Sequence, residues 1–192
     1  LEFRRVLFRS PHGRGASSKQ NPAGGSVWIW GDHAVEAALA NPARVIQRIV
    51  VTNETARTLP PPPRSAPEPE NMSPGALGAL LPAGAVHQGL ALLVKPLENL
   101  DIIEACEISG EAARSVVLVL DQVTDPRNVG AILRSAAAFG VRAIVTPAAH
   151  SAPETGALAK AASGALERVP LVRVSNLARA LTQLADLGYW RI

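Results

Sequence analysis

The sequence predicts an α/β fold with two domains, the second of them built on a parallel β-sheet. From residue 115 onwards, apolar strand-like runs alternate with helix-like segments, which is typical of parallel strands joined by right-handed helical crossovers. A proline-rich stretch at 58–70 and an acidic stretch at 97–114 precede that regular region. With 192 residues, of which 47% are hydrophobic, the chain is long enough to bury a substantial core.

The first domain is predicted to occupy residues 26–97 as a small α/β unit. Its prolines at 58–70 fix φ and remove backbone donors, so this stretch is expected to be a loop rather than a regular element. Ser73 and Pro74 are suited to the N-cap and first turn of a short helix. The remaining expected elements are a short apolar run that turns into a helix at 27–39, a strand at 45–52, a helix at 73–81 and a strand at 86–96.

Two segments are predicted to lie outside these domains. Residues 1–25 are interpreted as a disordered or artefactual tail, because the chain begins with Leu and a basic stretch that no apolar signal segment follows. Residues 98–114 are interpreted as a linker, in the form of an acidic, solvated helix.

The second domain is predicted to begin at residue 115 and to run to residue 192. The continuous apolar run at 116–121 is typical of a strand buried on both faces. Asp125 and Pro126 are suited to the start of a helix, and Gly140 to its end. The next expected elements are strands at 141–147 and 169–174, a helix at 156–166, a helix capped by Ser175, and the start of a fourth strand in the final YWRI.

Charge and cysteine content limit the functional classes. The formal net charge is +3, with a positive balance in residues 1–20 and 115–192 and a negative one between them, so the charge pattern gives only modest support for nucleic-acid binding. The single cysteine, Cys106, excludes an internal disulfide and a cysteine-rich metal site. No apolar run reaches the roughly 20 residues that a membrane span requires.

The chemistry-bearing residues gather where the helix after the first parallel strand begins. Arg127 and Arg134 are seven residues apart and share a helix face, and Asn128 lies in the first turn. In an open parallel sheet, ligands bind beyond the carboxyl ends of the strands, so this position suits a phosphate and a ribose. The loop lacks the dinucleotide-binding and P-loop patterns, and from spacing alone a packing helix with surface arginines is an equally good interpretation.

Several segments together resemble the SpoU family of RNA ribose 2′-O-methyltransferases. DPRNVGAILRSAAAFG is similar to the family's N-x-G-x-x-x-R-x-A-x-A-F-G motif, and it follows a strand ending in LD. The later segment AKAASGALERVPLVRVSNLARAL also resembles these enzymes. Upstream, WGDHAVEAAL and HQGLALLVKPLE resemble the two ends of the family's ribosomal-protein-like substrate-binding domain. The resemblance covers about residues 27–192 and is strongest to enzymes that methylate a guanosine ribose in 23S ribosomal RNA.

The resemblance implies a SPOUT-type, trefoil-knotted methyltransferase domain that uses S-adenosylmethionine and forms a homodimer. Two later family motifs that build the knot and the cofactor pocket have no counterpart in this sequence. The chain is therefore expected to be a C-terminally truncated fragment with an incomplete, knot-free methyltransferase domain and cofactor contacts beyond Ile192. Weak cofactor binding, a weakened dimer and an inactive fragment are the corresponding expectations.

The family's motif assigns catalytic roles to Arg134 and Asn128. An arginine is a poor base, so Arg134 is expected to position the target phosphate and stabilise the developing alkoxide of the ribose. Asn128 is expected to orient Arg134 or the ribose. Arg127 is a candidate contact to a substrate phosphate, and a solvated surface charge is the equally favoured alternative.

Gly130 and His33 are the remaining substrate-binding candidates. Gly130 would allow the backbone to approach RNA, or it would allow tight helix packing. His33 is a candidate RNA contact, although capping or local packing is favoured. No metal site is expected, because the four histidines show no ligand spacing.

Other polar and aromatic residues are assigned structural roles. Ser163 and Glu167 are candidates to support the site, and the structural interpretation is favoured. Trp28 and Trp30 could stack on bases, but packing is the preferred interpretation.

Two other functions remain open at the level of sequence. The first is an RNA-binding module without catalysis, and the second is a ribose methyltransferase that acts on transfer RNA. A generic nucleotide-binding α/β protein is a third, weaker possibility. The partner expected under the main hypothesis is ribosomal RNA, in the cytoplasm and without a membrane.

Overall fold

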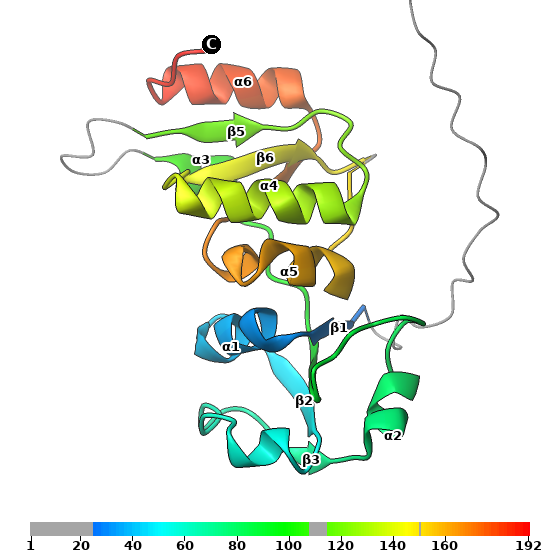
Figure 1. Ribbon diagram of the computed structural model, residues 1–192. Helices are drawn as coiled ribbons and strands as arrows, with labels where there is room; N and C mark the ends of the chain where they lie inside the picture. Colours follow the sequence, from blue (N-terminus) through cyan, green and yellow to red (C-terminus); the bar gives the residue numbers. More distant parts are fainter. Residues whose placement is uncertain (1–24, 108–114, 150) are drawn as a thin grey trace, which may run out of the picture.

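The computed structural model describes residues 25–107, 115–149 and 151–192, and it contains two β-sheets. The four-stranded sheet has the order β1-β4-β2-β3, and the three-stranded sheet has the order β5-β6-β7 (Figure 1). Most of the predicted tail at 1–25 and part of the predicted linker at 98–114 lie outside the described residues.

The first sheet is built around β4, Leu90–Val94, which pairs antiparallel with β1, Val27–Trp30, and β2, Ile46–Val51. The two-residue β3, Glu70–Asn71, adds parallel to β2. Helix α1, Asp32–Ala40, follows β1 as predicted. The α/β character of the first domain and its strand at 45–52 are confirmed, whereas the short β3 was not predicted.

The connections of the first domain follow the local sequence signals. The Oγ of Ser73 accepts a hydrogen bond from the backbone N–H of Ala76 and caps α2, Pro74–Ala79, as predicted. The proline-rich stretch contains no helix or strand until β3 begins at its last residue; a 3-10 turn, η1 at Thr55–Arg57, precedes it. The last strand starts later than predicted, because Gln88 and Gly89 have φ of 55° and 84° and form a turn before Leu90.

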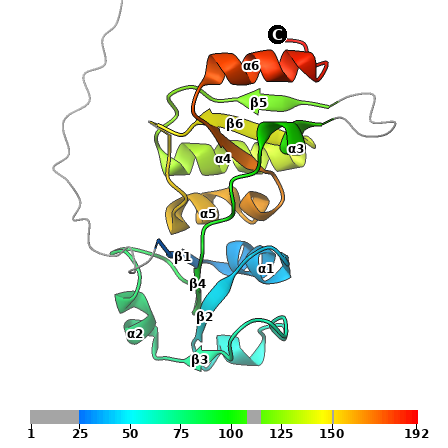
Figure 2. The same ribbon diagram turned by 180° about the vertical axis from the view of Figure 1, so that it is seen from behind.

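The second sheet is parallel, as predicted, and helices cover both of its faces (Figures 1 and 2). Its strands are β5, Val117–Val119, β6, Ala143–Pro147, and β7, Leu171–Val174. Apolar side chains of α4 and α5 pack against one face, and those of α3 and α6 against the other. The bounds of these helices are Pro126–Ala138 for α4, Gly156–Ala162 for α5, Ile102–Cys106 for α3 and Leu177–Asp186 for α6.

The predicted linker helix is wrong in one important respect: it is not solvated. Helix α3 is only five residues long, and Ile102, Ala105 and Cys106 are buried against β6, β7 and α6. Burial raises the pKa of the Cys106 thiol, which keeps it protonated at neutral pH. Asp101, Glu104 and Glu107 are exposed, and this acidic pattern in the sequence favoured a solvated helix over the three positions that pack.

The first and the last strand predicted for the second domain also differ from the structure. β5 is an edge strand rather than one buried on both faces, and Val116 and Val119 are 53% and 36% exposed. The final YWRI does not form a strand, because no neighbouring strand pairs with it among the described residues. Instead, the Oη of Tyr189 donates to the carbonyl of Cys106 over 2.9 Å and lies 3.0 Å from the Oγ of Ser115.

Two helix boundaries differ from the sequence expectation. The helix predicted at 156–166 ends at Ala162, because Ser163 and Gly164 both adopt the left-handed conformation, and a 3-10 turn, η2 at Ala165–Glu167, follows. Helix α6 is capped by Asn176 rather than by Ser175, since the Oδ1 of Asn176 accepts from the N–H of Arg179.

The two halves of the molecule share one hydrophobic core. Helix α5 packs against α4 on one side and against β1 and α1 on the other (Figure 1). Ile29 and Val35 of the first half belong to the same buried cluster as Leu133 and Leu158 of the second. Full burial of each such side chain contributes about 1.5–3 kcal/mol. The domain boundaries at 97 and 115 remain predictions, but the packing between the halves is continuous.

Candidate active site and domain junction

Helix α4 begins where its sequence predicts. The Oδ1 of Asp125 accepts a 2.8 Å hydrogen bond from the backbone N–H of Arg127, and Pro126 occupies the first helical position. Val129, Leu133 and Ala136 are buried, as the apolar stripe predicts. These contacts fix which face of α4 turns away from the core.

The outward face of α4 carries the three residues that the motif singles out. Arg127, Asn128 and Arg134 are all exposed. Within the described part of the chain, no hydrogen bond or ion pair engages their side chains. The guanidinium of Arg127 and the amide of Asn128 are therefore free to meet a ligand beside the positive end of the helix dipole, and Arg134 stands exposed two turns further along α4.

Gly130 lies one turn before Arg134, but unlike Arg134 it is buried in the protein. A Cβ on Gly130 would lie 2.6 Å from the Cβ of Ala161 and 2.6 Å from the carbonyl oxygen of Leu158. Gly130 is buried, so the close approach that it permits is between α4 and α5. Of the two sequence interpretations, the structure therefore supports tight helix packing, and Gly130 is not a substrate contact in this conformation.

His33 lies apart from the outward face of α4. It sits in the first turn of α1 with its side chain 80% exposed, and its Nδ1 is 3.9 Å from the Oε2 of Glu36. Residues of β1, α1 and α5, including Lys160 and Ser163, line the small hollow beside it, and no α4 residue does. His33 remains a possible RNA contact of the first domain, separate from Arg134.

The structural interpretations of the two tryptophans and of Glu167 fit the contacts. Trp28 and Trp30 are 8% and 6% exposed and pack in a cluster with Leu77 and Leu81, so they do not offer a ring face for base stacking. Glu167 is 3% exposed at its side chain and is occupied by an ion pair. Ser163 ends α5 in a left-handed conformation.

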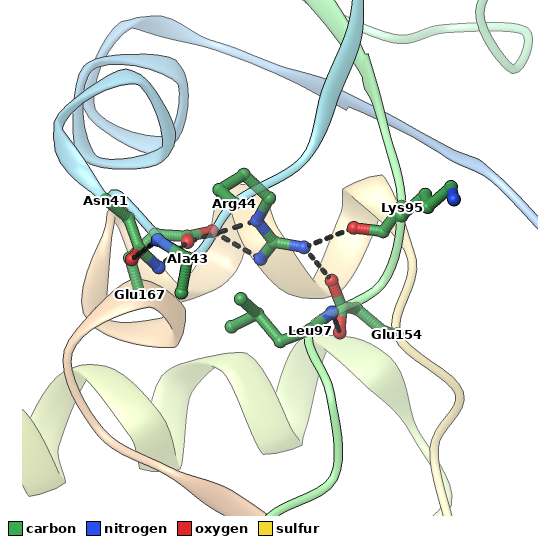
Figure 3. A network of polar contacts seen from close by, with 7 residues as sticks. All are labelled: Asn41, Ala43, Arg44, Lys95, Leu97, Glu154 and Glu167. Atoms are coloured by element: carbon green, nitrogen blue, oxygen red, sulfur yellow. Dashed lines mark hydrogen bonds and ion pairs between the residues drawn. The ribbon is translucent and has the colours of Figure 1, made fainter. Parts of the chain in front are cut away.

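A buried network at the junction of the two halves was missed by the sequence analysis. Arg44 lies between α1 and β2, and its side chain is fully buried. Its Nη1 is 2.7 Å from the Oε1 of Glu154, and its Nη2 is 2.5 Å from the Oε1 of Glu167 (Figure 3). Burial by itself lowers the pKa of Arg44, but the hydrogen bonds and charges of Glu167 and Glu154 outweigh it and raise that pKa.

The described residues contain no group of three or more His, Cys, Asp or Glu side chains that could hold a metal ion. No helix in this part of the chain combines the length and the apolar character of a membrane span.

Comparison with known proteins identifies the family. Residues 115–192 match the model of the SpoU rRNA Methylase family. The 23S rRNA (guanosine-2'-O-)-methyltransferase RlmB of Vibrio cholerae is 42% identical over 167 residues, which cover 84% of this chain and 67% of that protein. The chain belongs to the SpoU rRNA methylase family.

Further relatives of the SpoU family support the same conclusion over shorter stretches. The RlmB of Vibrio vulnificus is 48% identical over 107 residues, which are 56% of this chain and 43% of that protein. The crystal structure of the SpoU methyltransferase AviRb from Streptomyces viridochromogenes matches with a TM-score of 0.64 at 19% identity, covering 85% of this chain and 59% of that one. At that identity the likeness shows the fold alone, and it confirms the SPOUT-type α/β architecture.

The cofactor implied by the SpoU family is S-adenosylmethionine. The hollow that lies beside α4 and β5 is lined by apolar side chains, and Ser135 provides the one polar side chain in that lining. The loop from Asp121 to Asp125 is largely exposed. The apolar lining of that hollow does not fit an adenosine and an amino-acid group.

Proposed function

We propose that the protein takes part in S-adenosylmethionine-dependent methylation of a ribose 2′-hydroxyl in ribosomal RNA, with a 23S rRNA guanosine as its target. The observation that carries the proposal is the outward face of α4, where Arg134, Asn128 and Arg127 stand exposed, with Arg127 and Asn128 in the first turn of the helix that follows the parallel strand β5. The names of the Vibrio relatives support the choice of a guanosine in 23S rRNA.

Under this proposal, Arg134 acts on the ribose and its phosphate. S-adenosylmethionine supplies an electrophilic methyl group when it is bound. A guanidinium is a hydrogen-bond donor and a poor base, so Arg134 stabilises the negative charge that develops on the 2′-oxygen while the hydroxyl proton passes to water and the oxygen takes up the methyl group. Its planar fork also suits the adjacent phosphate, which fixes the orientation of the sugar.

Asn128 and Arg127 complete the proposed substrate surface. Asn128 lies one residue beyond Arg127 in the first turn, and its amide can both donate to a ribose oxygen and accept from its hydroxyl. Arg127 lies on the same side of the helix as Arg134, about two turns closer to the helix start, where it can contact a second phosphate. Two guanidinium groups on one face suit consecutive phosphates of an RNA strand.

The partners and location in the proposal follow from the same reaction. Ribosomal RNA is the substrate, the first domain serves as a substrate-binding domain, and the cytoplasm is the compartment. A homodimer is part of the proposal, and the exposed Val116 and Phe139 provide apolar surface that association could cover. Sedimentation velocity tests the dimer directly, and a purely monomeric protein at micromolar concentration would remove it from the proposal.

The experiment that tests the function is methylation of a transcribed 23S rRNA fragment with radiolabelled S-adenosylmethionine. With a protein that also carries the two later family motifs, nucleoside digestion followed by mass spectrometry is expected to find 2′-O-methylguanosine, whereas residues 1–192 alone are expected to transfer no label. A transcript with a single 2′-deoxyguanosine at the modified position should lose the product. A matched transfer RNA transcript serves as the competing substrate, and preferential methylation of it would replace ribosomal RNA in the proposal.

The alternative function, RNA binding without catalysis, gives a different result in the same assay. An RNA-binding module without catalysis would shift the electrophoretic mobility of the 23S fragment and transfer no label, even in a protein that carries the two later motifs. That outcome would reject the proposed reaction while retaining RNA as the partner.

A further inference from the structure

The junction network draws its members from three separate parts of the chain. Arg44 comes from the turn between α1 and β2, Glu154 from the connection that leads into α5, and Glu167 from η2 just after α5. Their side chains are 0%, 6% and 3% exposed. Figure 3 shows the guanidinium lying between the two carboxylates, which approach it from opposite sides.

Each acceptor of the network ties the guanidinium to another segment. The Nε of Arg44 donates to the Oε2 of Glu167 over 3.1 Å, and its Nη1 donates to the carbonyl of Lys95 over 2.9 Å. The Oε2 of Glu154 also accepts from the backbone N–H of Leu97 at 3.2 Å. The network therefore links the first half, its exit after β4 and both flanks of α5.

A second set of contacts, along α5, leaves no room for the halves to slide. A Cβ on Gly156 would lie 1.9 Å from a ring carbon of Trp30 and 2.2 Å from the carbonyl oxygen of Trp28. At the other end of α5, a Cβ on Gly164 would lie 3.0 Å from the carbonyl oxygen of His33. Between them, the Nζ of Lys160 donates to the carbonyl of Val86.

The apolar contacts and the ionic network restrict the relative orientation of the two halves to different degrees. Hydrophobic burial is non-directional and would tolerate several relative orientations of two packed halves. A guanidinium with two carboxylates accepts only a narrow range of geometries, because each hydrogen bond fixes a distance and an angle. In a buried site every missed bond leaves an unpaired charge, which is strongly unfavourable.

We infer that Arg44, Glu154 and Glu167 are positioning residues that hold the first domain at one fixed orientation relative to α4, so that RNA bound by the first domain presents its ribose to Arg134 at a fixed span. This inference rests on the proposed function for its consequence on RNA. The layer order supports it, because α5 and η2 lie between the first half and α4, and the network contacts the segments on both sides of α5.

The structural part of the inference is tested by distances between two spin labels. Cysteines introduced at the exposed Ala56 and Ala185 report on the first and second halves, while Cys106 is buried and stays unlabelled. The wild-type background should give one narrow distance distribution. Glu167→Gln should broaden it or split it, because the amide removes one charge and one acceptor from Arg44.

Glu70→Gln is the matched control. Glu70 also pairs with an arginine, Arg48, at 2.7 Å, but that pair lies within the first half and is about 40% exposed. It should leave the distance distribution narrow. A narrow distribution in a folded Glu167→Gln protein would overturn the inference.

A triple variant keeps the test decisive if Glu167→Gln fails to fold. Arg44→Met, Glu154→Gln and Glu167→Gln together remove every buried charge, while the amide oxygens still accept from Leu97 and Asn41. Such charge-free replacements of buried ion networks commonly fold. A broad distribution is expected, and a narrow one would show that apolar packing alone sets the orientation.

The functional part of the inference is tested by steady-state methylation of the 23S rRNA fragment, again with a protein that carries the two later family motifs. Because a misplacement of about 1 Å can cost on the order of 10²-fold in rate, Glu167→Gln should lower kcat/KM by roughly 10- to 10²-fold. The loss should appear mainly in kcat, because the first domain still binds the RNA while its ribose is misplaced relative to Arg134. Glu70→Gln should lose less than twofold. An unchanged kcat/KM alongside a broadened distance distribution would refute the positioning role.

The two proposals fail in distinguishable ways. A wild-type protein that carries the two later motifs and transfers no methyl group would reject the proposed function, while the distance measurements would still confirm or refute the fixed orientation. An active protein whose variants keep narrow distances would reject only the positioning role.

Discussion

The molecule uses arginine in two opposite ways. Arg44 has a fully buried side chain with two carboxylates and a backbone carbonyl around it. Arg127 and Arg134 are exposed, and no partner engages their side chains among the described residues. The same functional group is saturated at the junction of the halves and open on the outer face of α4.

The contrast separates charges that support the fold from charges that are available to a ligand. A buried guanidinium whose three nitrogens all donate to protein acceptors is not accessible to a substrate, and removing it leaves its carboxylates uncompensated. An exposed guanidinium contributes little to stability, so a helix can carry it for another purpose. The candidate site is therefore identified by how far an arginine side chain is exposed and whether a protein group already binds it. The residue type alone does not identify it.

The largest effect is expected for Arg44→Ala. Removing one member of a buried charge network typically costs about 3–5 kcal/mol, because Glu154 and Glu167 would remain buried without their counter-charge. Urea denaturation measures the free energy of unfolding. The exposed Arg57→Ala serves as the control and should stay within about 0.5 kcal/mol of wild type. Equal free energies of unfolding for the two variants would show that the buried Arg44 supports the fold no more than an exposed arginine does.

Arg134→Ala should give the reverse result. Its unfolding free energy should change by about 0.5 kcal/mol or less, since the side chain is exposed. Single-turnover methylation by a protein that carries the two later motifs should fall by about 10²–10³-fold, the usual effect of losing a preorganised charge at a reacting oxygen. Arg134→Lys should recover little of the rate, because a point charge does not reproduce the planar fork. Near-normal methylation by the alanine variant would make Arg134 an ordinary surface residue.

Gly130→Ala tests whether that glycine serves packing. The added methyl group would overlap Ala161 and the backbone of Leu158, and such overpacking typically costs about 1–3 kcal/mol. Gly75→Ala is the matched control in α2, where a Cβ would meet nothing within 4 Å. Thermal unfolding should show a lowered midpoint for the first variant only. An unchanged midpoint together with weakened RNA binding would restore the substrate-contact interpretation.

The smallest effect is expected for Glu70→Gln. The hydrogen bond from Arg48 lowers the pKa of Glu70 below the ordinary value of 4.5, so the folded state favours the ionised carboxylate. The pair therefore stabilises the protein above that pH, and the contribution is lost as the pH falls through the lowered pKa. Because the pair is exposed, the variant should lose about 1 kcal/mol or less at pH 7. Wild type and variant should converge in urea titrations under acidic conditions, and a difference that persists there would exclude the ion pair as its cause.

Local signals in the sequence predicted most of the elements and the outward face of α4. Asp125 and Pro126 mark a helix start through backbone chemistry that acts within three residues. The apolar stripe of α4 then determines which side is left for Arg127 and Arg134. Such features need no knowledge of the partner against which the helix packs.

The failures have a common physical origin in contacts between distant residues. Arg44 meets residues that are 110 and 123 positions away, and nothing in its local sequence indicates a buried network. The run at 116–121 is apolar enough for a central strand, but its place at the sheet edge depends on which strands pair. The acidic stretch around α3 reads as solvated because the three buried positions are too few to form a clear periodicity.

The position of α5 between the halves has a consequence for how the nascent chain folds during synthesis. Trp30 and Ile29 leave the ribosome more than a hundred residues before Gly156 and Leu158, the residues that cover them. Part of the apolar surface of the early strands therefore stays uncovered until α5 has been synthesised. Closure of such a long loop slows folding and ties the two halves into a single cooperative transition. A ribosome stalled before residue 156 would hold an N-terminal half that is sensitive to proteases, although all four of its strands have already been made.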